Sequence, residues 1–301
     1  MKWKKLGKIF EINNSNKKEW CESHTSNPIA INFETEKIRV YFSTRDKYGK
    51  SNIGSFDYSI KEKKVTKIAE EPVMLHGKEN EIDESGIGIG NIIKIKEEFY
   101  LYYMAWQTPR NEHWRGDIAR GKLDIKTNKI IRDDDFCLGI DNEIDKISLS
   151  YPFIIKKDRK YYMWYGSTIT WNYGNGEMLH IINWGTSIDG KEFVRNGKAV
   201  NYEIGKAQAF SRPTVIYWNK KWRMWFSYRG NKDLYKIGYA ESTDLENWEI
   251  KDSNFYTSDS NWDSEMVCYP FVFEYKEKLY MLYNGNGYGK TGIGLAVLEE
   301  E

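Results

Sequence analysis

A short run dominated by aromatic residues recurs five times along the chain, each time after a charged turn. Its copies are RVYFS, YLYYM, YMWYG, RMWFS and YMLYN, at residues 39–43, 100–104, 162–166, 223–227 and 280–284. The steps are 61, 62, 61 and 57 residues for the series Tyr41, Tyr102, Trp164, Trp225 and Leu282. Short runs rich in aromatic residues are typical of β-strands, and an even step predicts a repeat architecture.

Each repeat has the same internal order. An apolar segment comes first and in four repeats opens with a proline: Pro28, Pro152, Pro213 and Pro270. The aromatic strand, a longer loop and a third strand follow, the last marked by Ile53, Ile118, Ile182, Ile237 and Ile293. A weaker fourth strand closes the unit. Four short strands repeated radially describe a propeller blade, so the pattern predicts an all-β, five-bladed β-propeller.

The fifth repeat stops after its third strand, at Leu298. The segment Trp3–Phe10 has the pattern of the missing fourth strand. Pairing it with the last repeat removes an exposed sheet edge. We therefore expect a single domain over residues 1–301, with its ring closed by the N-terminal strand.

Composition narrows the function classes. The chain carries 45 Lys+Arg against 44 Asp+Glu, and this balance does not predict a nucleic-acid partner. The N-terminus lacks the apolar run of a signal peptide, and nothing approaches the roughly 18 apolar residues of a membrane span. The three cysteines are far apart, with no CxxC spacing. A reduced, cytoplasmic protein of unknown oligomeric state fits best.

The loops that enter the innermost strands of a propeller form the floor of its central pocket. Glu84 and Glu265 are the only glutamates placed directly before such a strand in their repeats. Two carboxylates, one acid and one base or nucleophile, are what glycoside hydrolysis requires. We expect them to be the catalytic pair, with His24 relaying a proton. Alternatively, each hydrogen-bonds backbone amides at a strand end.

Three arginines, Arg45, Arg212 and Arg229, are expected near the same axis. A guanidinium binds carboxylate and phosphate through two parallel hydrogen bonds, so an arginine without a carboxylate partner predicts an acidic or phosphorylated sugar. The alternative is that they pair with Asp46, Glu84 or Glu265.

Wall residues complete the expected binding site. The substrate-binding candidates are Arg45, Asp46, Trp106, Trp171, Ser150, Arg212, Tyr228, Arg229, Asn284, Asn286 and Tyr288. Aromatic side chains among them suit stacking on sugar rings. The histidines show no metal-ligand spacing, so neither a metal nor a cofactor is expected.

Taken together, these residues resemble the arabinanase, levansucrase and invertase superfamily of five-bladed propellers over the whole chain. The strings SHTSNP, YFSTRD, SRP, WDSEMVCYP and YNGNGYGKTG are most similar to uncharacterised members that accompany surface-polysaccharide genes. The resemblance implies a propeller glycosidase or a related sugar-processing protein.

The chain departs from that family at the catalytic positions. Hydrolytic members carry aspartates directly before the first and third blade prolines and a glutamate in the fourth blade. Here those places hold Asn27, Tyr151, and Ser211 with Arg212. The family's catalytic residues are therefore not carried over.

Three functions follow as hypotheses. The first is a hydrolase-like enzyme that acts on an acidic or phosphorylated glycan through Glu84 and Glu265. The second is a non-catalytic carbohydrate-binding module in polysaccharide assembly. The third is a transferase or phosphorylase acting on a phospho-sugar, which phosphate-dependent turnover would distinguish. The partner in each is a small-molecule sugar or oligosaccharide.

Overall fold

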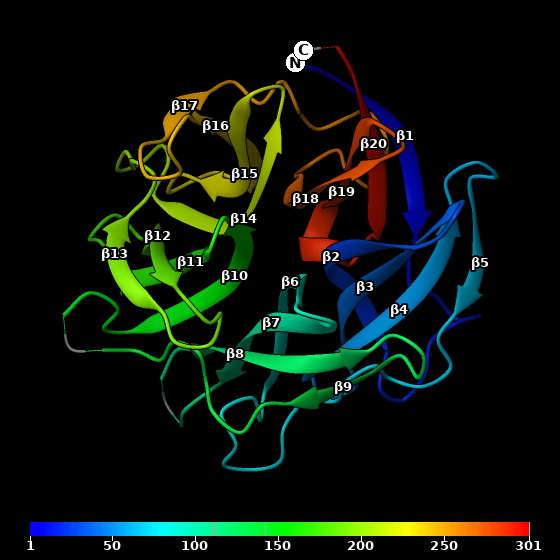
Figure 1. The fold of residues 1–301 in the computed structure, drawn as a ribbon, viewed down its shortest axis with the longest axis horizontal. Helices are drawn as coiled ribbons and strands as arrows, with labels where there is room; N and C mark the ends of the chain where they lie inside the picture. The colour runs from blue at the N-terminus through cyan, green and yellow to red at the C-terminus, as the bar shows by residue number, and fades with distance from the viewer. Residues whose placement is uncertain (111, 142, 301) are drawn as a thin grey trace.

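The computed structural model describes residues 1–110, 112–141 and 143–300. In this part of the chain, twenty β-strands and one 3₁₀ turn, η1 (Asn286–Gly289), make up the regular structure. The strands form one four-stranded antiparallel sheet and two eight-stranded sheets. Each eight-stranded sheet consists of two antiparallel groups of four strands, joined by a single parallel pairing between β4 and β6 or between β12 and β14. Figure 1 shows these groups arranged around a common centre. The all-β prediction is confirmed.

In each group, four strands follow one another from the centre of the molecule outward (Figure 1). The innermost strands are β2 (Ser23–Glu34), β6 (Gly86–Ile95), β10 (Ser148–Lys157), β14 (Ala209–Trp218) and β18 (Cys268–Tyr275). The second strands are β3 (Lys37–Arg45), β7 (Glu98–Gln107), β11 (Lys160–Thr170), β15 (Lys221–Arg229) and β19 (Lys278–Asn284). The third strands are β4 (Ser51–Ser59), β8 (Arg115–Asp124), β12 (Leu179–Ser187), β16 (Lys236–Ser242) and β20 (Ile293–Glu300). The outermost are β5 (Lys64–Ile68), β9 (Lys129–Arg132), β13 (Val194–Lys198), β17 (Glu249–Lys251) and β1 (Lys2–Phe10).

The second and third strands carry the core. The repeat-defining aromatic positions are all fully buried, at 0% exposure for Tyr41, Tyr102, Trp164, Trp225 and Leu282. In β4 every residue is buried, so the strand shows no alternation of buried and exposed positions. Both faces of such a strand are covered, so its polar residues, among them Asn52 and Asp57, are buried together with Ile53 and Phe56.

Bulges interrupt four of the inner strands at the repeated prolines. The pairing register shifts between Ser26 and Ile29, Ser150 and Phe153, Ser211 and Thr214, and Cys268 and Phe271. The residue before each proline adopts a positive φ: 54° for Asn27, 38° for Tyr151, 57° for Arg212 and 54° for Tyr269. A bulge of this kind re-aims a side chain out of the ordinary strand alternation.

The two ends of the chain meet in one group. Strand β1 pairs antiparallel with β20, with Trp3 opposite Leu298 and Phe10 opposite Ile293. Both termini lie side by side in Figure 1. The Trp3 ring also packs edge-on against Trp225, with centroids 5.9 Å apart. Within the described ranges, no helix is long and apolar enough to cross a membrane.

Candidate functional site

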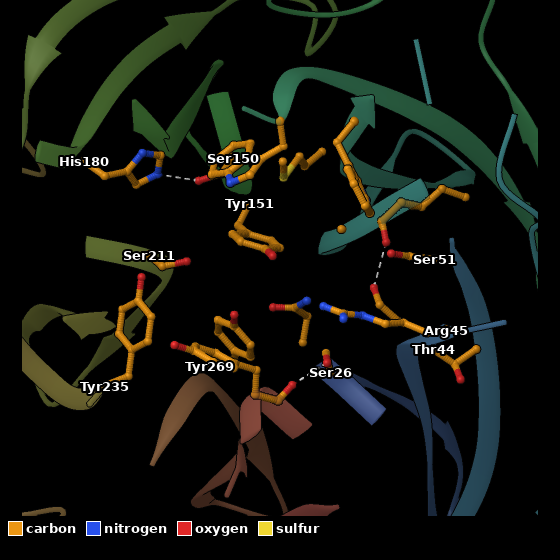
Figure 2. A pocket seen from close by; sticks show the side chains of 18 of the residues that line it. Ser26, Thr44, Arg45, Ser51, Ser150, Tyr151, His180, Ser211, Tyr235 and Tyr269 are labelled. Atoms are coloured by element: carbon orange, nitrogen blue, oxygen red, sulfur yellow. Dashed lines mark hydrogen bonds between the residues drawn. The ribbon is translucent and has the colours of Figure 1, made fainter. Parts of the chain in front are cut away.

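A cavity of about 330 Å³, here called the central cavity, opens where the inner strands converge (Figure 2). Its floor comes from the positions just before the repeated prolines and their counterpart in β6. These floor residues are Ser26, Asn27, Gly88, Ser150, Tyr151, Ser211 and Tyr269. Its walls come from the ends of the second and third strands and the loops beyond them. The walls include Thr44, Arg45, Ser51, Met104, Trp106, Trp114, Met178, His180, Arg229, Tyr235 and Tyr288.

The charge on this lining is one-sided. Among the described residues that line the central cavity, two are arginines and none is an aspartate or glutamate. Arg229 is neutralised, because its Nε lies 2.7 Å from Glu177 Oε2 and its Nη2 donates to Glu177 Oε1 at 3.0 Å. It also donates from Nη1 to the Tyr288 hydroxyl at 2.9 Å. A positive charge that is already paired contributes less to anion binding.

Arg45 differs from Arg229. Its guanidinium makes no hydrogen bond or ion pair with any described residue, and Figure 2 shows the side chain extending toward the middle of the cavity, where Tyr151 and Tyr269 also lie. The Tyr151 and Tyr269 rings lie 5.8 Å apart. Burial raises the pKa of both phenols, so they are neutral hydrogen-bond donors at neutral pH. The centre of the cavity therefore presents one unpaired cation and two hydroxyls.

One wall holds a fixed chain of hydrogen bonds. Ser150 Oγ lies 2.7 Å from His180 Nε2, and His180 Nδ1 lies 2.8 Å from Thr168 Oγ1. Burial, aided by the charge of Arg229, lowers the pKa of His180 to about 3. The ring is therefore neutral, with one nitrogen donating and the other accepting. The arrangement fixes the position of the Ser150 hydroxyl in the lining of the cavity.

Gly166 makes room for this chain. A Cβ at this position would lie 2.2 Å from Ser150 Oγ and 2.3 Å from His180 Nε2. Those separations are far below van der Waals contact, so a side chain here would force the serine or the histidine aside.

The structure places five of the predicted site residues on the central cavity: Arg45, Trp106, Ser150, Arg229 and Tyr288. The predicted catalytic pair does not meet there. Glu84 accepts a hydrogen bond from the Asn80 backbone N–H at 2.7 Å, in the turn before β6. Glu265 is exposed and lines a different depression, called here the lateral groove. Neither glutamate is among the described residues that line the central cavity, which corrects the expectation, because adjacency to an inner strand does not set a side chain's direction.

Neither His24, in β2, nor Asp46, in the turn after β3, lines the central cavity. His24 sits at φ 65°, with Nδ1 2.9 Å from Ser23 Oγ. Burial, followed by the charges of Arg45 and Lys290, lowers the pKa of His24 to about 4. Asp46 Oδ1 accepts from the backbone N–H groups of Tyr48 and Lys50, both at 2.9 Å.

Asn284 and Asn286 hold neighbouring segments together. Asn284 accepts from Asn27 N at 3.0 Å and donates to Thr25 O at 2.7 Å, which ties β19 to β2. Asn286 Oδ1 accepts from the backbone N–H of Glu265 at 2.9 Å. Their amides are occupied by the fold, and neither lines the central cavity.

The remaining predicted residues lie around the cavity. Trp171 stacks on His113 and meets Trp114 edge-on, each with centroids 4.7 Å apart, and Trp114 itself lines the cavity. Tyr228 lines the lateral groove. Arg212 is fully buried and lies next to Tyr151 and Tyr269.

Sequence reasoning did not place Tyr151, Tyr269, Trp114, Tyr235 or His180 among the binding residues. A usable signal exists for the first two, because each stands directly before a repeated proline. His180 carries no comparable signal, since only the pairing of β11 with β12 brings it opposite Thr168. Within the described ranges, no group of three or more His, Cys, Asp or Glu side chains is arranged to hold a metal ion.

The family of this chain is shown by its similarity to known proteins. No family model matches the chain. Two uncharacterised proteins of Mycobacterium tuberculosis, MT1551 and Rv1502, are each 35% identical over 304 residues, covering 99% of this chain and 100% of the relative.

Solved structures with the same architecture are more distant in sequence. One, described as a glycoside hydrolase, is 14% identical with a TM-score of 0.75, over 99% of this chain and 92% of its own. Another, a sucrose-6-phosphate hydrolase from Lactobacillus gasseri, is 14% identical with a TM-score of 0.69, over 94% and 62%. The chain therefore belongs to the family of the two mycobacterial proteins, and its fold is that of solved β-propeller glycoside hydrolases.

Proposed function

We propose that this protein is a glycan-active protein whose central cavity binds a sugar bearing a carboxylate or phosphate group. The observation that carries the proposal is Arg45, which projects into the cavity without an ion pair to any described residue. The cavity's described lining contains no carboxylate that would repel an anion. A guanidinium in this setting suits a planar or tetrahedral oxyanion.

The rest of the lining suits a sugar ring. Trp106, Trp114 and Tyr288 offer aromatic faces around the opening, and Ser150 offers a hydroxyl held in place by His180. A binding site of this kind combines apolar surfaces with a few fixed polar groups. One solved neighbour is named a sucrose-6-phosphate hydrolase, and this name supports a phosphorylated sugar as one candidate ligand.

Recognition is better supported than hydrolysis through two carboxylates. That mechanism places its carboxyl groups about 5–5.5 Å or about 6.5–9.5 Å apart across the bond that breaks. The described lining of the central cavity supplies neither group, and Glu84 and Glu265 lie elsewhere. We therefore favour a carbohydrate-binding role and leave phosphate-dependent transfer as an outcome of the test.

The test is a binding screen of the purified protein by calorimetry, with uronic acids, sugar phosphates and matched neutral sugars, and with products followed by mass spectrometry. Replacing Arg45→Gln should weaken acidic ligands about 10- to 100-fold, the worth of one charge-assisted hydrogen-bonded contact. Lys47→Gln, an exposed neighbour that does not line the cavity, is the matched control.

Equal affinity for neutral and acidic sugars, or an Arg45→Gln variant that binds as the wild type does, would rule out anion recognition by this cavity. Turnover of a glycan would show that the protein is an enzyme, and turnover only with phosphate present would identify a phosphorylase.

We also infer that the four-stranded groups form five blades of one domain and that β1 closes the ring. The antiparallel pairing of β1 with β20 and the packing of Trp3 on Trp225 support this. Deleting residues 1–10 should cost roughly 3–5 kcal/mol of unfolding free energy, about the burial of two large side chains. Chemical denaturation measures this, and adding a peptide of residues 1–11 should restore part of the loss. An undiminished midpoint would contradict closure.

A cytoplasmic location remains part of the proposal. Cys21, Cys137 and Cys268 are all unpaired and buried, and burial raises the pKa of Cys21 to about 11. Such thiols suit a reducing compartment. Fractionation of the native cells is the measurement, and recovery of the protein outside the cytoplasm would refute it.

A further inference from the structure

Arg212 is the most deeply buried charged side chain near the central cavity, at 0% exposure. Its only hydrogen bond to a described residue runs from Nη2 to the Pro28 carbonyl oxygen at 3.3 Å. Nε and Nη1 are buried and have no hydrogen-bond partner among the described residues. Several donors of this guanidinium are therefore left unused inside the protein.

No described carboxylate offsets this charge. The titratable groups that face Arg212 are Tyr151 from β10 and Tyr269 from β18, and the Phe271 ring lies 6.0 Å from the guanidinium carbon. Burial keeps both tyrosines neutral by raising their pKa, so they do not supply negative charge. Burial also lowers the pKa of Arg212 to about 9, and the side chain is still protonated at neutral pH.

Another buried arginine of this protein, Arg39, has its charge offset by a carboxylate. Arg39, 7% exposed, donates from Nε to Asp57 Oδ1 at 2.6 Å and from Nη2 to Oδ2 at 3.0 Å. A buried charge without such a partner is strongly destabilising, because it has lost its hydration and nothing in the protein offsets it. The buried charge of Arg212 would therefore be stabilised by an anion that is not part of the chain.

We propose that Arg212 forms a buried anion site beside the central cavity, which takes a compact monovalent anion such as a halide ion or a carboxylate group. The anion accepts hydrogen bonds from Nε and Nη1. Tyr151 and Tyr269, which interact with the Arg212 charge, also line the central cavity. This proposal rests on the burial of Arg212 and does not depend on whether the central cavity binds a sugar.

The experiment uses the full-length protein in gluconate buffer at constant ionic strength, titrated separately with chloride, bromide and acetate. The thermal midpoint should rise by a few degrees and saturate, because an anion that binds only the folded state stabilises it. Diffraction from a bromide-soaked crystal should show an anomalous peak next to Arg212. Arg212→Met should lose both signals, while Arg45→Gln keeps the halide response.

The two sources of the anion are separated by competition. If bromide lowers the affinity for glucuronate, the site holds the ligand's carboxylate, and if both bind independently, it holds a resident halide. A wild-type midpoint that none of the three anions moves, with no bromide peak, would overturn the proposal and show that water alone satisfies Arg212. A response that persists in Arg212→Met would overturn it as well, by locating the anion elsewhere. If Arg212→Met does not fold, the position of the bromide peak in the wild-type crystal decides the matter: a peak next to Arg212 supports the proposal, and a peak only elsewhere overturns it.

Discussion

The central cavity and the lateral groove differ in volume and in the charge of the side chains that line them, and the charge matters more for anion binding. The groove is larger, about 1060 Å³ against about 330 Å³, and is lined chiefly by residues 201–207, 232–238 and 250–257 together with Tyr228 and Glu265. It holds acidic and basic side chains in equal number: Glu203, Asp233, Asp252, Glu265, Lys206, Lys232, Lys236 and Lys251. The described lining of the cavity holds two arginines and no acid.

The two regions also differ in whether their charged side chains form ion pairs. In the groove, Lys206 lies 2.5 Å from Glu203 and Lys236 lies 3.0 Å from Asp233, so opposite charges offset one another. In the cavity, Arg45 has no such partner among the described residues. Anion recognition depends on charge that the fold leaves unpaired, and the volume of a depression says little about it.

The largest expected effect is the loss of affinity for an acidic sugar when a charge is reversed in the central cavity rather than in the lateral groove. Arg45→Glu places a negative charge in the cavity and should reduce affinity for an acidic sugar by more than about 100-fold, because attraction becomes repulsion. Lys251→Glu in the groove should change it by no more than about twofold, as expected for a solvent-screened charge. Calorimetry on both variants measures this. Equal losses would show that the groove takes part in binding.

A steric change in the cavity wall should have an intermediate effect. Gly166→Ala would push a methyl group into Ser150 and His180 and should lower the unfolding free energy by about 1–3 kcal/mol. Ser150→Ala, which removes the hydrogen bond without a clash, should cost less. Urea denaturation compares the two. A Gly166→Ala variant as stable as the wild type would mean that the hydrogen-bonded chain is not held rigidly.

The smallest expected effect is the dependence of stability on pH. The usual pKa of histidine is about 6.5 and that of folded His180 is about 3, so the unfolded chain takes up a proton across this interval and the folded chain does not. His180 therefore contributes stability that is complete above about pH 6.5 and is lost as pH falls toward 3. His180→Gln should flatten this slope, whereas His113→Gln, in an exposed loop, should leave it unchanged. Identical slopes in all three proteins would contradict a buried neutral His180.

Much of the fold could be predicted from the repeat. The predicted aromatic segments fall inside β3, β7, β11, β15 and β19, because large aromatic side chains favour buried positions in strands. The segment Trp3–Phe10 was expected to pair with the last repeat, and β1 does pair with β20. Such features depend on local pattern, which the sequence carries in full.

The candidate site could be predicted only in part. Arg45, Trp106, Ser150, Arg229 and Tyr288 were expected to bind substrate and do line the cavity. These residues stand at the inner ends of strands or just beyond them, where the direction of the chain limits where a side chain can go. Glu84 met the same positional criterion, yet it hydrogen-bonds its own turn.

The sequence alone determined the strands, their order and the places where polar residues enter the centre, because hydrophobic period and spacing are local properties. Tertiary structure decided which of those side chains face one another. Tyr151 and Tyr269 reach the cavity through bulges with positive φ, and His180 meets Ser150 only through the pairing of neighbouring strands. It also decided that Arg229 is paired while Arg45 is not, since ion pairing depends on distances between side chains that are remote in the chain.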